Sequence, residues 1–438
     1  MKKHTGFQLL LMIIVVGMLN VDQNIMGSTL GMIEKEFNVN DANIGAMTML
    51  FTVVGAVVSL IWGYFSDKSN RKILFTLSVL IGEVPCFLTA FSTNYNQFFI
   101  FRILTGIGVG ASLPTIFSML GDMYDQKHRA TAVTLMTTVM GVGQIAGPLL
   151  GGFVGPVYGW RLPFILASVP NILFLVLFYI FVHEPKRGAG EDSIKEMIEA
   201  GVVYPRTIKL SDYKRLAQVK TNIFLIIQGI IGMIPWGAIP LFIVKFLNEH
   251  KGLSIQDATL VFMLFGVGNV IGTIVGGEIG GILMKRKAIY LPHFCTLANL
   301  AGTVLCLIMF AALPPGTMIW FLMIGFIASC LISVTGPNVK TMVMDTNVPE
   351  NRGAIFSIFN LTDSVGAGIG PFFAGNLSVL FGLKMAMIAS VAIWLPCALL
   401  MWITSLFFVA DLQQEHQKIS IVAEEMAQMK PTSKTLNM

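Results

Sequence analysis

Three charged residues interrupt long apolar stretches of the chain. Asp22 lies in MLNVDQNIMG, Asp363 in FNLTDSVGAG, and Arg102 begins RILTGIGVG. A charge at the centre of a bilayer costs roughly 2.5–3.5 kcal/mol on insertion scales, so such side chains are expected to face a cavity or a partner. Burial also favours the neutral form of a carboxyl group. We therefore predict that Asp22 carries a proton and that Arg102 pairs with Asp22 or holds an anionic solute group.

Asp363 is predicted to be a second titrating site or a contact for the solute. Each of these residues also has a structural alternative. Asp22 could cap a helix break, Asp363 could make a structural hydrogen bond, and Arg102 could extend to the membrane surface.

Polar and aromatic residues near these charges are candidates for solute binding. They are Gln23 and Asn24 beside Asp22, Asn360 one helical turn before Asp363, and Trp236 in GMIPWGAIP, where the chain can bend.

Three further charged residues within apolar stretches are expected to have other roles. Glu83, beside Pro85, is expected to be structural. Lys245 is expected to extend to the membrane surface, and Lys340 to pair with Asp345 one turn away.

The composition indicates that lipid is the solvent around these residues. Of 438 residues, 55% are hydrophobic and 12% are charged, and the mean hydropathy is +0.75. A soluble core cannot absorb that much apolar surface. The five cysteines lie in apolar runs without metal-ligand spacing, so we expect no metal site and no disulfide framework. The net charge of +5 is spread over short loops, which makes nucleic acid an unexpected partner.

The apolar stretches are long enough to cross a bilayer, which takes about 20 residues per helix. They predict twelve spans, near 7–33, 42–65, 73–93, 97–121, 129–153, 161–182, 221–247, 256–283, 288–312, 317–344, 351–380 and 384–409. Most of the 29 Lys and Arg fall in alternate loops, together with both termini. Because such loops face the cytoplasm, we predict a multi-pass protein of the cell membrane with both termini cytoplasmic.

The two halves of the chain are related in sequence. A constant offset of 223 residues aligns eight residue pairs: Pro114 with Pro337, Asp122 with Asp345, Arg129 with Arg352, Gly143 with Gly366, Gly147 with Gly370, Pro148 with Pro371, Gly152 with Gly375 and Gly159 with Gly382. Parallel repeats of six helices build one class of transporters, with the solute between the halves. We therefore predict an all-α membrane protein of two pseudo-symmetric six-helix bundles, 1–182 and 221–410, joined by a cytoplasmic linker, 183–220, and followed by a cytoplasmic tail, 411–438.

Glycines and prolines are concentrated in GVGQIAGPLLGG and in its repeat, SVGAGIGPFFAG. Small residues let helices approach closely in a membrane. We predict that these segments form a close-packed seam between the halves that slides during transport. The gating candidates are Gly143, Gly147, Pro148, Gly370 and Pro371, and the alternative is ordinary helix packing.

The chain resembles the major facilitator superfamily over essentially its full length. Three motifs carry the resemblance: GYFSDKSNRK at 63–72, RILTGIGVG at 102–110 and GQIAGPLLGG at 143–152. The last is similar to a motif of the family's antiporters. LNVDQN, EFNVNDANIG and GWRLPFILASVPN are similar to spinster-like transporters of lysolipid-like or sphingolipid-like amphiphiles. The proton-coupled drug exporters are the rival branch.

The first of these motifs is predicted to latch the cytoplasmic side through ion pairs across the seam. Its members are Gly63, Asp67, Arg71 and Lys72. The pairs Asp122 with Arg129 and Asp345 with Arg352 occupy the matching loops of the two halves and are assigned to the same latch.

These features together predict a proton-coupled secondary transporter of a small amphiphilic organic solute, working outward by alternating access. We expect a monomer without a cofactor and no enzymatic activity, because no nucleophile and base are spaced for catalysis. The alternatives are a proton symporter for organic anions, in which Arg102 clamps the anion, and a membrane receptor that no longer transports.

Overall fold

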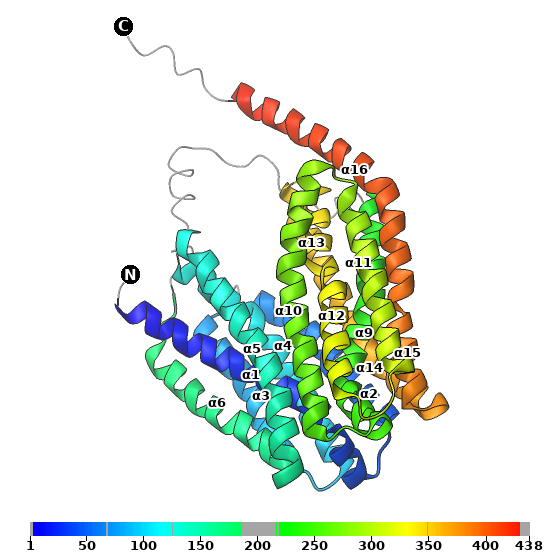
Figure 1. The fold of residues 1–438 in the computed structure, drawn as a ribbon. Coiled ribbons are helices and arrows are strands. Elements are labelled where there is room, and N and C mark those ends of the chain that lie inside the picture. Colours follow the sequence, from blue (N-terminus) through cyan, green and yellow to red (C-terminus); the bar gives the residue numbers. More distant parts are fainter. Residues whose placement is uncertain are drawn as a thin grey trace.

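A computed structural model describes residues 3–66, 69–124, 126–185, 216, 219–347 and 349–429 of the chain. Within these ranges the side chains of 3–5, 126–130, 349–354, 356–357, 416 and 418–429 are outside the description. The described residues are helical, with no strand among them (Figure 1). They contain twelve stretches long and apolar enough to span a bilayer, which agrees with the twelve predicted spans.

The first six spans are single helices. They are α1 (Lys3–Phe37), α2 (Asp41–Ser66), α3 (Arg71–Thr89), α4 (Tyr95–Met123), α5 (Gln126–Tyr158) and α6 (Arg161–Phe181). We call this group the first half.

The other six spans form the second half, in which three spans change geometry midway. The single helices are α9 (Lys220–Lys251), α10 (Ile255–Arg286) and α14 (Pro349–Phe381). The composite spans are α11 (Tyr290–Leu307) with the π-helix η1 (Ile308–Ala312), α12 (Met318–Ser333) with α13 (Thr335–Asp345), and α15 (Leu383–Ala392) with α16 (Trp394–Met429). Because α16 continues to Met429, the predicted tail at 411 begins inside a helix.

Short polar residues start several helices. Asn70, Asn94 and Ser254 accept hydrogen bonds from the backbone N–H groups of Ile73, Gln97 and Asp257, over 3.1, 3.0 and 3.0 Å. Such caps satisfy donors that have no partner in the first turn. Gly252 ends α9 in the left-handed region, with φ of 69°, which favours glycine.

Equivalent helices make equivalent contacts in the two halves. In the first half α1 packs on α5, and in the second half α9 packs on α14. The halves meet mainly through α2 with α14 and α5 with α10, with α1 also touching α9. The sequence repeat is thus reflected in the helix packing.

The glycine motifs serve two different contacts. A Cβ added at Gly143 or Gly147 would meet α1, 2.8 Å from the Cβ of Asn20 or 3.0 Å from that of Asn24. A Cβ at Gly370 would lie 2.9 Å from the backbone nitrogen of Ala238 in α9. Each of these contacts lies inside one half, so the prediction that these three glycines form the seam is wrong.

The seam contacts come from other residues of the same motifs. A Cβ at Gly152 would lie 2.8 Å from Thr259 Cβ in α10, and one at Gly375 would lie 3.2 Å from Ala42 Cα in α2. Pro371 also touches the other half, where its carbonyl faces Gly45 of α2. Pro148 is buried in α5, next to the packing glycine Gly147.

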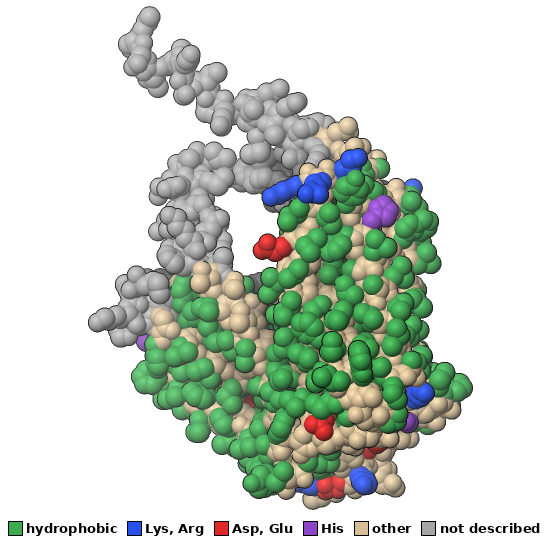
Figure 2. All heavy atoms as spheres, in the orientation of Figure 1, with side chains coloured by type: hydrophobic (Ala, Val, Ile, Leu, Met, Phe, Trp, Pro, Cys, Tyr) green, Lys and Arg blue, Asp and Glu red, His purple; other side chains and the backbone are tan. Residues whose placement is uncertain are grey.

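The two ends of the bundle differ. We call the end at which α1 begins and α6 ends the terminal end, and the opposite one the far end. At the far end the halves converge, whereas α5 and α10 diverge towards the terminal end (Figure 1). Hydrophobic side chains cover most of the visible face, with Lys and Arg near its two ends, and the surface is hollowed between the halves at the terminal end (Figure 2).

Candidate functional site

A buried ion pair lies at the centre of the first half. Arg102 of α4 donates from Nη1 to Asp22 Oδ1 of α1 over 2.9 Å, and the two side chains are 2% and 0% exposed. The Arg102 guanidinium also lies 5.1 Å from the ring centroid of Phe51 and 5.5 Å from that of Phe164. Of the two roles predicted for Arg102, its position fits pairing with Asp22. Helix α1 runs unbroken through Asp22, so Asp22 caps no helix break.

Arg102 also lines a cavity between the halves, which we call the central cavity. Its volume is about 180 Å³. Two predicted solute-binding residues, Gln23 and Asn24, lie in its wall. The amide nitrogen of Asn24 donates to Asn20 O over 2.8 Å, which ties that side chain to its own helix. The second half contributes Gly237, Pro240, Leu241 and Phe262 to the wall.

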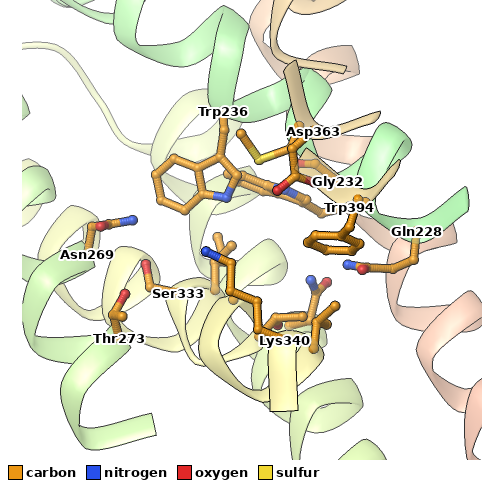
Figure 3. A pocket seen from close by; sticks show the side chains of 17 residues that line it. Gln228, Gly232, Trp236, Asn269, Thr273, Ser333, Lys340, Asp363 and Trp394 are labelled. Carbon is orange, nitrogen blue, oxygen red and sulfur yellow. The ribbon is translucent and has the colours of Figure 1, made fainter. Parts of the chain in front are cut away.

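A larger cavity of about 260 Å³ lies within the second half, and we call it the second-half cavity (Figure 3). Trp236 of α9 and Asp363 of α14, both predicted, line it. Lys340 of α13 points into the same space and interacts electrostatically with Asp363. The predicted pairing of Lys340 with Asp345 is not among the described ion pairs and stays a prediction. Asn360 is exposed and is not among the residues that line this cavity.

Aromatic and amide side chains complete the second-half cavity. Trp394 donates from Nε1 to Gly232 O over 3.0 Å, and its ring meets Trp236 edge to face with centroids 5.6 Å apart. Gln228, Asn269 and Asn299 place polar groups in the wall. Sequence reasoning missed these residues because isolated amides in apolar helices give no motif. The aromatic side chains of this cavity suit an aromatic or apolar solute body, and Lys340 and Asp363 suit a charged group on it.

Four side chains connect the halves at the far end, and we call them the far-end cluster: Glu34 of α1, Asp41 of α2, Lys245 of α9 and Ser378 of α14. Lys245 Nζ donates to Glu34 and, over 2.7 Å, to Asp41 Oδ1. Ser378 Oγ donates to Asp41 Oδ2 over 2.5 Å. The Lys245 side chain is only 11% exposed, so the prediction that it extends to the membrane surface is wrong.

The sequence held a weak signal for this cluster. Glu34 and Asp41 flank the turn between the first two spans, and Lys245 is a cation within the seventh span. Nothing in the sequence related them, because Lys245 is 204 residues from Asp41.

At the terminal end, Arg71 joins three helices of the first half. Its guanidinium contacts Asp122 Oδ2 at 2.5 Å and Glu184 Oε1 at 2.9 Å and donates to Pro185 O over 2.9 Å. The Lys72 backbone donates to the other oxygen of Glu184 over 2.7 Å, and its Nζ lies 4.8 Å from the Tyr179 ring centroid. These contacts hold the ends of α3, α4 and α6 together.

The contacts of Arg71 and Lys72 at the terminal end therefore differ from the predicted latch, which would join the two halves. The described contacts of Arg71 and Lys72 stay within one half, which fits a bundle whose halves have separated at this end. Gly63 lies in α2 beside Pro114 of α4, also in the first half. Asp345 ends α13. Asp67 and the side chains of Arg129 and Arg352 lie outside the described residues.

Among the described residues, no group of His, Cys, Asp and Glu could hold a metal ion. The described cysteines are unpaired: Cys86, Cys295, Cys306 and Cys397 are buried, and Cys330 is half-buried.

A bundle of twelve membrane helices in two repeated halves, with a cavity between them, defines a multi-pass membrane transporter. The chain belongs to the Major Facilitator Superfamily, whose sequence profile matches residues 12–371.

Among curated relatives, the benzoate transport protein of Acinetobacter baylyi is 24% identical over 58% of this chain and 60% of its own length. The sphingosine-1-phosphate transporter SPNS2 of Danio rerio is 21% identical, and protein spinster homolog 3 of Mus musculus is 24% identical. Each of these two matches covers 79% of this chain and 70% of the relative.

Solved structures share the fold. A bacterial homolog of the human lysosomal transporter spinster, described as inward-facing and unoccupied, superposes with a TM-score of 0.85 at 19% identity. That superposition covers 94% of this chain and 99% of the homolog. The D-xylose-proton symporter gives a TM-score of 0.68 at 16% identity over 90% of this chain and 97% of its own. The predicted superfamily and fold are confirmed, and the sequence is similar to spinster proteins.

Proposed function

We propose that the protein is a proton-coupled transporter that exports a small amphiphilic organic solute by alternating access. The observation that carries this proposal is the buried Asp22–Arg102 pair, of which Arg102 lines the central cavity. A carboxylate held by a cation gains a proton when the cation leaves, and an anionic solute group would compete for that cation. Proton binding and solute binding are thereby linked at one place.

The halves are closed at the far end and apart at the terminal end, which is one of the two access states that the proposal needs. The similarity to an inward-facing spinster homolog supports a cytoplasmic terminal end, because the two chains superpose over 94% of this one. The excess of Lys and Arg in the loops of that end supports the same orientation. Outward transport is supported by the resemblance of GQIAGPLLGG to the antiporter motif.

We propose that the second-half cavity is a solute site in addition to the space that Arg102 faces in the central cavity. Trp236, Trp394 and Phe359 offer apolar contact, whereas Lys340 and Asp363 offer charge. Its 260 Å³ is slightly below the roughly 300–1,000 Å³ typical of ligand pockets, which favours a small aromatic solute or a headgroup over an entire lipid.

A second candidate function is symport of an organic anion with protons. Lys340 in one cavity and Arg102 in the other favour it, since both cations line space large enough for a carboxylate. The relative that transports benzoate supports the same solute class. A receptor that does not transport is the third possibility, and a transport assay excludes or establishes it directly.

The experiment is solute flux in proteoliposomes of the full-length protein with and without a pH gradient, with benzoate and a lysophospholipid as separate probes. Asp22→Asn is expected to abolish gradient-driven flux while solute binding persists. Removing one partner of a buried ion pair typically costs about 3–5 kcal/mol, so the charge-balanced double variant Asp22→Asn with Arg102→Gln controls for folding. Gradient-driven flux at the wild-type ratio in Asp22→Asn would reject Asp22 as a proton carrier, and absence of flux in the wild type would favour the receptor.

A further inference from the structure

The two carboxyl groups deepest in the first half face one guanidinium. Asp22 and Glu83 are both fully buried, and Glu83 of α3 interacts electrostatically with Asp22 and with Arg102. Among the described residues, the Cys86 thiol, one turn further along α3, is a further titratable group that faces this cluster. With both acids ionised, the cluster would carry a net charge of −1, and both carboxylates would be fully buried. A single bound proton makes it neutral.

The hydrogen bonds of the cluster show where that proton fits. In this cluster the Arg102 guanidinium donates a hydrogen bond to Asp22 Oδ1. Glu83 has another partner, because Asn171 of α6 donates from Nδ2 to Glu83 Oε1 over 2.6 Å. Among the described residues, Glu83 Oε2 and Asn171 Oδ1 have no hydrogen-bond partner, although both are buried.

One proton on Glu83 would give both of these atoms a hydrogen-bond partner. A protonated carboxyl group donates one hydrogen bond and still accepts others. An acid and an amide can therefore form a two-bond ring, in which Glu83 O–H donates to Asn171 Oδ1 and Asn171 N–H donates to Glu83. An ionised Glu83 would instead leave two acceptors without a donor in a buried site, which is costly.

We propose that Glu83 holds a proton in this access state and shares it with Asp22 during coupling. When Arg102 turns from Asp22 towards the central cavity, the Glu83 O–H bond breaks and an O–H bond forms on Asp22. Oδ2 of Asp22 has no hydrogen-bond partner among the described residues and is available for that bond. This inference rests on the proposed proton coupling and adds a second acid to it, one that the sequence analysis assigned a structural role.

The first test reads the proton directly. Infrared spectra of the purified full-length protein at neutral pH are compared between the wild type and Glu83→Gln in the region of the protonated carboxyl stretch. Gln can make the same two bonds with Asn171, so the variant is expected to fold. We expect the difference spectrum to show the loss of one protonated carboxyl group. Glu249→Gln, which changes an exposed acid of α9, is expected to show no such loss. An unchanged protonated-carboxyl region in Glu83→Gln would overturn the proposal.

The second test concerns coupling in proteoliposomes. Glu83→Gln is expected to bind the solute but to lose at least tenfold in gradient-driven flux, and Glu83→Asp to recover part of it. A variant that lacks the infrared band but retains wild-type coupling would show that the proton is merely structural, and the proposal would be wrong. If wild-type flux is independent of pH, the proposed function fails instead, whereas the infrared result still decides the protonation of Glu83.

Discussion

Lys245 Nζ lies 2.7 Å from Asp41 Oδ1, and this contact joins the two halves of the transporter at the far end. Lys245 also contacts Glu34, so one cation from the second half faces two carboxylates from the first. The three side chains are largely buried, where ion pairs are only weakly screened by salt. Transport by alternating access requires this cluster to separate whenever the far end opens.

Lys245→Met is expected to open the far end. Without the lysine, Glu34 and Asp41 face each other as like charges, and the closed state should lose at least tenfold in population, or about 1.4 kcal/mol. Distances between spin labels at Thr93 and Lys384, which belong to different halves near the far end, would report the opening. Lys251→Met is the matched control, because Lys251 is a buried lysine of the same helix that donates to Leu313 within its own half. Equal distances in both variants would contradict a gating role for the cluster.

Gly375→Ala is expected to act on the same equilibrium by sterics. The added methyl group would meet the Asp41 and Ala42 backbone of α2 across the seam. Overpacking typically costs about 1–3 kcal/mol, and here the cost applies only while the far end is closed. The same spin labels should therefore show more of the open state. Gly141→Ala controls for helix propensity, because its methyl group would meet nothing within 4 Å. If Gly141→Ala gave the same shift, the seam contact could not be its cause.

Charge in the second-half cavity is expected to set affinity for an anionic solute. Lys340→Gln removes a cation that faces the cavity. Because hydrogen bonds to charged groups contribute about 1.5–3 kcal/mol, binding of an aromatic carboxylate should weaken about tenfold or more. Asp363→Asn removes a repelling charge and should strengthen it. Calorimetric titration with benzoate measures both changes. Lys285→Gln, at an exposed position of the terminal end, should leave binding unchanged. Equal affinity in Lys340→Gln and the wild type would exclude this cavity as the anion site.

The orientation in the membrane is expected to follow the charge of the loops. A cysteine placed at Lys287, between α10 and α11, should be labelled by an impermeant maleimide only from the cytoplasm. One at Asn96, near the start of α4, should be labelled only from outside. Both positions are exposed at opposite ends of the bundle. The unsubstituted protein is the control for its native cysteines, and labelling of the two positions from the same side would contradict the proposed topology.

Residues that act within one helix or one loop could be assigned from the sequence. The twelve spans follow from runs of apolar residues, because a bilayer requires length and hydrophobicity and little else. The internal repeat was visible because both halves retain glycine, proline and charged residues in one register. Asp22 and Arg102 stood out because charges in apolar runs need a partner, and the structure brings together these two residues 80 positions apart.

Only the tertiary structure decided which partner each side chain has. Gly147 and Gly152 share one motif, yet the first packs α5 on α1 inside a half and the second meets Thr259 across the seam. Glu83 became a candidate proton carrier only in the structure. There Asn171, 88 positions away, donates to one Glu83 oxygen, and the other Glu83 oxygen and Asn171 Oδ1 have no hydrogen-bond partner among the described residues. A helix presents its faces to several neighbours at once, so spacing along the chain gives the face but not the neighbour. In a membrane, which supplies little hydrophobic force between helices, the neighbour is chosen by close packing and by partners for buried polar groups, and both are properties of the assembled bundle.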